Sequence, residues 1–100
     1  MTNGIEGVLN RQHVQTFNEF MHELDMVFAT YRVQPLEKDD GFAVTFKPNS
    51  IPNHSMRGWA DVLVESANAL MHFMRQYDFC EEDTYVDHSA RRITYVLMVD

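Results

Sequence analysis

Carboxylates and histidines are the side chains of this 100-residue chain whose spacing could support chemistry. Asp83, Asp87 and His88 follow one another closely enough to hold a divalent cation through oxygen and nitrogen ligands. Turns also collect Asp and His for conformational reasons, so a small metal-dependent hydrolase ranks third among our hypotheses. His22 and Glu23 do not form the HExxH pattern of zinc proteases, and we expect them to be solvated.

The sequence contains no nucleophile or phosphate-binding motif that we can identify. It has no GxSxG motif, and its four glycines are too scattered to build a glycine-rich phosphate loop. Cys80 precedes two glutamates, whose negative charge disfavours a reactive thiolate. A single cysteine also excludes an internal disulfide. We therefore expect no catalytic residue, no metal site and no cofactor.

Acidic side chains are concentrated in one part of the chain. Fifteen Asp and Glu against eight Lys and Arg give a net charge of −7. Such charge attracts basic proteins and repels nucleic acids and anionic membranes. We therefore predict a docking surface for a basic protein, without direct contact to nucleic acid or membrane. Residues 76–90 contain five carboxylates and no Lys or Arg: Asp78, Glu81, Glu82, Asp83 and Asp87.

Within this stretch, charge and apolar area would have separate roles. Glu81, Glu82 and Asp83 would supply the electrostatic attraction. Tyr77, Phe79 and Tyr85 would supply apolar area that is buried against the partner. The alternative is a solvated acidic surface that only keeps the protein soluble.

Helical periodicity predicts two amphipathic helices. The first is expected over 10–31, with Asn10 as its N-cap and residues 1–9 as a flexible N-terminus. The second is expected to follow Ser55 as N-cap, with an apolar stripe over 59–77.

Period-two alternation predicts two hairpins. Pro35 cannot donate a hydrogen bond within a sheet, so the first strand should lie at an edge. The order αββαββ predicts one α+β domain over 10–100, with two helices on one face of a four-stranded antiparallel sheet. The expected strands are 31–36, 42–47, 84–87 and 92–99.

The last expected strand is apolar on both faces. Val96 and Met98 would lie on the face that the two helices leave open. This arrangement favours, as the alternative function, a structural or assembly protein that forms a homodimer through its sheet and has no inhibitory role.

Size, charge and composition also indicate a compartment and a class of protein. The chain has no long apolar run, and residues 1–6 do not resemble a signal peptide, so we expect a cytoplasmic protein. Its profile is similar to that of the small immunity, anti-restriction and anti-CRISPR proteins of phages and bacteria. The leading hypothesis is a non-catalytic inhibitor or adaptor that docks on a basic, nucleic-acid-handling protein.

Overall fold

The structure, a computed structural model, describes the backbone of residues 3–100 and the side chains of residues 10–100. Its helices and strands follow the predicted order αββαββ, with a short 3-10 helix before the second long helix. The strands form one antiparallel sheet with the order β1-β2-β4-β3. The elements are α1 (Asn3–His22), β1 (Ala29–Pro35), β2 (Gly41–Pro48), η1 (Ile51–His54), α2 (Met56–Gln76), β3 (Phe79–Asp87) and β4 (Arg92–Val99).

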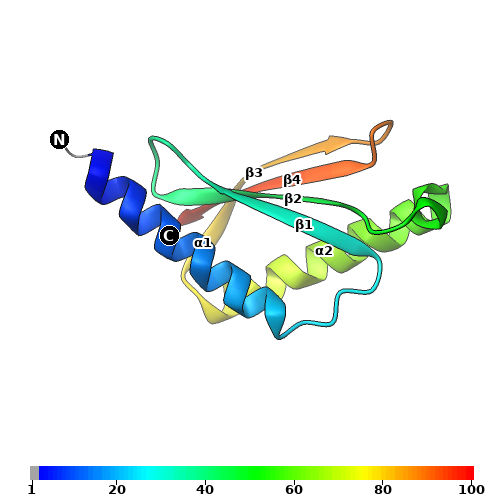
Figure 1. Cartoon of the computed structure of the whole chain (residues 1–100), viewed down its shortest axis with the longest axis horizontal. Helices are drawn as coiled ribbons and strands as arrows, with labels where there is room; N and C mark the ends of the chain where they lie inside the picture. Colours follow the sequence, from blue (N-terminus) through cyan, green and yellow to red (C-terminus); the bar gives the residue numbers. More distant parts are fainter. Residues whose placement is uncertain (1–2) are drawn as a thin grey trace.

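Both long helices lie on the same face of the sheet, and the core lies between the two layers (Figure 1). Phe17 from α1, Phe42 from β2 and Phe73 from α2 meet there, with ring centroids 5.0 to 5.9 Å apart. Tilted and edge-on contacts of this kind add to the free energy gained by burying the rings. The predicted fold class is confirmed. We call the other face of the sheet, which neither helix covers, the open face.

The first helix differs from its prediction at both ends. Residues 3–9, expected to belong to a flexible terminus, are helical, and residues 1–2 lie outside the described part of the chain. The helix ends at His22, because the chain then turns towards the first strand. Glu65 on α2 holds this turn: its carboxylate accepts backbone N–H bonds from Val27, Phe28 and Ala29 at 2.7 to 3.2 Å.

Asn10 was wrongly predicted to cap the first helix. It lies inside α1, is 1% exposed and joins the helix to the β1–β2 turn. Its Nδ2 donates to the carbonyl oxygens of Leu36 (2.7 Å) and Asp39 (2.9 Å). Its Oδ1 accepts the backbone N–H of Gly41 at 2.9 Å. Gly41 itself has no room for a side chain, since a Cβ would lie 2.1 Å from the carbonyl oxygen of Leu97.

The other expected elements are placed correctly, apart from the third strand. Ser55 caps α2, because its Oγ accepts the backbone N–H of Gly58 at 3.1 Å. β1 lies at a sheet edge, as Pro35 predicts, and β4 covers the expected 92–99. β3 is longer than the expected 84–87, because the acidic residues before it also pair with β4.

Candidate functional site

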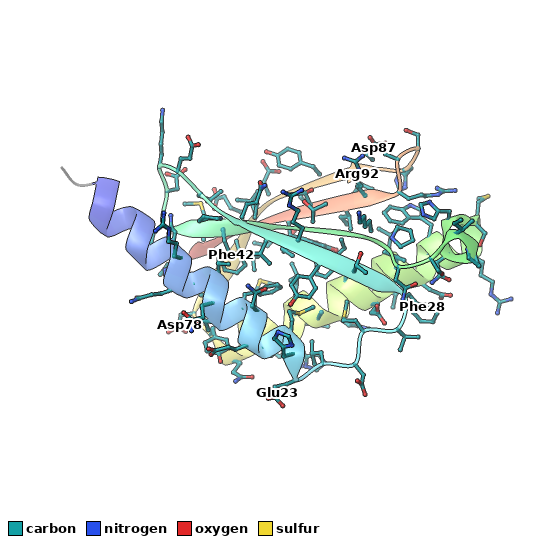
Figure 2. The ribbon with its side chains drawn as sticks, viewed as in Figure 1. Glu23, Phe28, Phe42, Asp78, Asp87 and Arg92 are labelled. Carbon is teal, nitrogen blue, oxygen red and sulfur yellow. The ribbon has the colours of Figure 1, made fainter. Side chains whose placement is uncertain are left out.

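The acidic segment forms an edge of the sheet. β3 is the last strand in the order β1-β2-β4-β3, so one side of its backbone has no neighbouring strand. At roughly 3.3 Å per residue, the distance from Asp78 to Asp87 is about 30 Å, and Figure 2 shows these two residues far apart in the molecule. We call five exposed residues the acidic edge: Asp78, Glu81, Glu82, Asp83 and Asp87.

Within the described side chains, the carboxylates of the acidic edge form no ion pair within 4.0 Å. Among the side chains of residues 10–100, the one contact within 4.0 Å between a basic and an acidic side chain joins His13 to Asp40 at 3.0 Å, outside this edge. Neutral groups donate hydrogen bonds to three of the edge carboxylates, those of Glu81, Asp83 and Asp87; the Thr84 hydroxyl, for example, donates to Glu81 at 2.5 Å. The charge of Arg92 contributes to lowering the pKa of Asp87, which lies opposite it, but the described side chains place no Lys or Arg within 4.0 Å of the acidic edge, so most of its negative charge is not neutralised locally.

A β-bulge at Glu82 divides the acidic residues between the two faces of the sheet. Glu81 lies opposite Leu97 and Asp83 lies opposite Val96, so Glu82 is the extra residue. Leu97 is buried beneath the helices, whereas Val96 is on the open face. Without the bulge, Asp83 would share the helix side with Glu81, because side chains alternate along a strand.

Beyond the bulge, Asp83, Tyr85 and Asp87 share the open face. The Tyr85 hydroxyl donates to Oδ2 of Asp83 at 2.6 Å, and this bond, with the charge of Asp83, raises the pKa of Tyr85. Oδ1 of Asp87 accepts from the backbone N–H of Ala90 (3.0 Å) and the hydroxyl of Ser89 (2.8 Å). These bonds lower the pKa of Asp87, because they favour its charged form.

The three aromatic residues expected at the docking surface have different environments. Tyr85 is 59% exposed and lies beside the carboxylates. Tyr77 and Phe79 are half-buried, with ring centroids 4.9 and 5.3 Å from that of Phe73 in the core. The structure therefore brings Tyr85 to the exposed acidic surface, whereas Tyr77 and Phe79 pack the start of β3 against α2.

The residues considered for a metal site are not assembled into one. Within the described part of the chain, no group of three or more His, Cys, Asp and Glu could hold an ion. Nδ1 of His88 accepts the indole N–H of Trp59 at 3.0 Å, and the guanidinium of Arg91 lies 5.9 Å from the centre of the Trp59 ring. His88 and Arg91 thus attach the β3–β4 turn to the start of α2.

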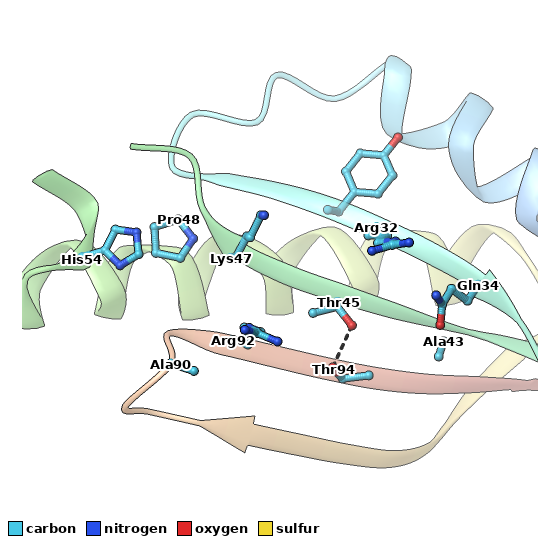
Figure 3. A pocket seen from close by; sticks show the side chains of 11 residues that line it. Arg32, Gln34, Ala43, Thr45, Lys47, Pro48, His54, Ala90, Arg92 and Thr94 are labelled. Carbon is cyan, nitrogen blue, oxygen red and sulfur yellow. Dashed lines mark hydrogen bonds between the residues drawn. The ribbon is translucent and has the colours of Figure 1, made fainter. Parts of the chain in front are cut away.

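The open face contains a hollow that sequence reasoning missed (Figure 3). It has a volume of about 880 Å³, and its cations come from three strands: Arg32 on β1, Lys47 on β2 and Arg92 on β4. The hydroxyls of Thr45 and Thr94 lie between them, 2.8 Å apart. Each of the three cations is at a strand position whose side chain points to the open face, and the alternation of apolar and polar residues along each strand could have identified it. Only the strand order places the three together.

Val96 and Met98 lie on the open face, as predicted. Both are half-buried, and they lie opposite Asp83 and Cys80 of β3. This position is compatible with the homodimer alternative, although the same face also carries the charged residues of the hollow.

Across residues 3–100, no helix combines the length and apolar character needed to span a membrane. Comparisons with models of known protein families, with curated proteins and with solved structures find no match to this chain. A functional interpretation therefore depends on the geometry and charge of the chain itself.

Proposed function

We propose that this protein is a non-catalytic inhibitor or adaptor that docks on a basic protein through its acidic edge. The observation that carries the proposal is the exposure of five carboxylates, four on one edge strand and one just before it, with no Lys or Arg within 4.0 Å in the described part of the chain. Carboxylates that are not neutralised by neighbours attract a complementary surface over a long range and repel other acidic proteins.

The shape of the acidic edge suits a partner that handles nucleic acid. Such a partner carries Lys and Arg in rows that follow a phosphate backbone. A row of carboxylates about 30 Å long, at roughly 3.3 Å per residue, can lie along such a groove. Tyr85 adds an exposed ring whose burial would contribute apolar contact area. The proposal places this contact in the cytoplasm, where a chain without internal disulfides remains folded.

Charge reversal tests the proposal. A variant with Glu81, Glu82 and Asp83 all replaced by Lys should lose its partner, because attraction becomes repulsion. The immobilised protein is used to capture proteins from a lysate of its own cells, and the captured proteins are identified by mass. The affinity of the purified partner is then measured at low salt, where charge effects are largest.

A matched variant controls for net charge. Glu19, Glu23 and Asp25 are also exposed but belong to α1 and the loop after it, so replacing them with Lys makes the same change in net charge elsewhere. This control should keep the partner, and circular dichroism should show that both variants are folded. Equal affinity of the wild type and the β3 variant at low salt, or capture of no basic protein, would reject the proposal.

A second candidate function is self-association through the open face. The half-buried positions of Val96 and Met98 on a face without helices favour it. Sedimentation at micromolar concentration distinguishes the two functions. A stable dimer whose partner binding does not depend on salt would favour the assembly role.

A further inference from the structure

The hollow in the open face has the dimensions of a small-molecule site. Its volume of about 880 Å³ falls within the range of roughly 300 to 1,000 Å³ that is usual for such sites. Small side chains leave this space: Ala43 and Thr45 on β2, Thr94 on β4, and Ala90 in the β3–β4 turn. The hollow is formed mainly by the sheet, with Ala90 of the β3–β4 turn and His54 of η1 also lining it.

The cations of the hollow are unusual in a chain with a net charge of −7. Three of the eight Lys and Arg residues, Arg32, Lys47 and Arg92, line this one site and are exposed. No carboxylate of the described side chains lies within 4.0 Å of any of them. Arg91 differs from these three cations, because its guanidinium already donates to two backbone carbonyl oxygens and lies over the Trp59 ring.

One acidic residue, Asp87, lies beside the cations of the hollow. Asp87 lies opposite Arg92 across the β3–β4 pair. Its Oδ1, however, accepts hydrogen bonds from Ser89 and Ala90 within the turn. The charge of Arg92 contributes to lowering the pKa of Asp87, but no oxygen of Asp87 lies within 4.0 Å of the Arg92 guanidinium, so Asp87 does not occupy its donors.

Hydroxyl groups lie where a bound anion would rest. Arg32 is opposite Thr45, and Thr45 is opposite Thr94, so one row across the sheet joins a guanidinium to two hydroxyls. The two threonine hydroxyls share one hydrogen bond of 2.8 Å, and the hydroxyl that accepts it keeps its own proton to donate. Arginine forks bind phosphate oxygens in pairs, and lysine adds a compact positive charge.

We propose that this hollow is a binding site for a small diphosphate compound, such as a nucleoside diphosphate. A diphosphate carries several negative charges on two adjacent tetrahedral groups, which matches cations that approach from three strands. Arg32 and Arg92 hold the two phosphates from β1 and β4, Lys47 binds from β2, and the threonine hydroxyls donate from the floor. This site adjoins the acidic edge where Asp87 lies opposite Arg92, but none of its lining residues belongs to that edge, and binding does not depend on the proposed docking.

Calorimetric titration tests the site with inorganic pyrophosphate and with ADP, in Mg²⁺-free buffer. Saturable binding with a Kd below about 1 mM is expected. Arg32→Gln and Arg92→Gln should each weaken it by about tenfold or more, since each removes a paired charge-assisted contact. Arg11→Gln is the matched control, because Arg11 is an exposed arginine on α1. It should leave the affinity unchanged.

Several outcomes would overturn the proposal. One is the absence of saturation for both probes at about 10 mM. A second is an equal loss in the Arg11 and Arg32 variants, which would indicate diffuse attraction. If citrate binds as tightly as pyrophosphate, the site recognises negative charge in general and is not specific for phosphate. Tighter binding of oligothymidylate than of both probes would identify a nucleic-acid surface. As a control for folding, the unfolding temperature of each variant should match that of the wild type, because the substituted side chains are exposed.

Discussion

Hydrogen bonds shift the pKa of two residues on β3, Tyr85 and Asp87. A phenolate at Tyr85 would lose its bond to Asp83 and face a like charge, so the pKa of Tyr85 is raised. For Asp87, bonds from Ala90 and Ser89 favour the carboxylate and lower its pKa. The pKa of Asp87 is thus lower in the folded state than the value near 3.9 for an unfolded chain. Its contribution to stability is present above that value and is lost as the pH falls through the folded pKa.

Replacing Asp83 with Asn should lower the pKa of Tyr85 towards its ordinary value of about 10. The amide is uncharged, so it no longer opposes formation of the phenolate. Phenolate absorbance is followed as the pH rises, and a Tyr85→Phe variant identifies the transition that belongs to this residue. Asp78→Asn serves as the control, because the Asp78 side chain makes no hydrogen bond to a tyrosine hydroxyl within the described part of the chain. An unchanged Tyr85 titration in Asp83→Asn would show that the hydroxyl bonds elsewhere in solution.

At the scale of elements, the two edges of the sheet are protected in different ways. Pro35 removes a hydrogen-bond donor from β1, whereas β3 carries a bulge at Glu82 and exposed carboxylates. Both devices oppose pairing with the edge of another sheet. The acidic edge therefore has a structural role that requires no partner, and this role is compatible with docking through side chains.

Asn10→Ala should destabilise the protein by about 2 to 4 kcal/mol, because two carbonyl groups and one N–H lose their buried partner. The substitution removes the three hydrogen bonds that link α1 to the β1–β2 turn. Urea denaturation measures the free energy of unfolding. Gln12→Ala in the same helix is the control, because Gln12 is exposed, and should cost less than about 0.5 kcal/mol, as a surface change does. Equal losses in both variants would mean that the Asn10 bonds contribute little.

At the scale of the whole molecule, opposite charges occupy different places. The acidic edge follows β3, whereas the cations of the hollow come from β1, β2 and β4. The chain therefore has a local cluster of positive charge even though its net charge is −7. The two surfaces adjoin at Asp87, which lies opposite Arg92 across the β3–β4 pair. Charges more than about 10 Å apart are largely screened at 0.1 M salt, so carboxylates farther along β3 affect the hollow less.

Reversing Glu81, Glu82 and Asp83 to Lys should leave pyrophosphate binding intact or strengthen it. Each substitution changes the charge by two, so the net charge rises from −7 to −1 and long-range repulsion of the anion decreases. Conversely, Arg32→Gln should still capture the basic partner. The same calorimetry and capture experiments measure both effects. Loss of pyrophosphate binding in the folded triple variant would indicate one continuous surface instead of two sites.

Local rules predicted the features that depend on neighbouring residues. Ser55 caps α2 through a backbone group three residues away, and Pro35 lacks its donor in any context. Tyr31 shows the limit of periodicity: its spacing fits a helix, yet it packs against Phe17 from β1, with ring centroids 5.9 Å apart. The bonds from Glu65 that hold the chain away from the helix come from 36 or more residues along the sequence, so no local pattern contains them.

By itself, the sequence determined the order of elements, the α+β class and the gathering of carboxylates after the second helix, because periodicity and composition are local properties. Tertiary structure alone decided the buried role of Asn10, the bulge that moves Asp83 to the open face, and the convergence of Arg32, Lys47 and Arg92. These features depend on which strands become neighbours. Strand order and register arise from contacts between distant segments, which single-residue preferences do not specify.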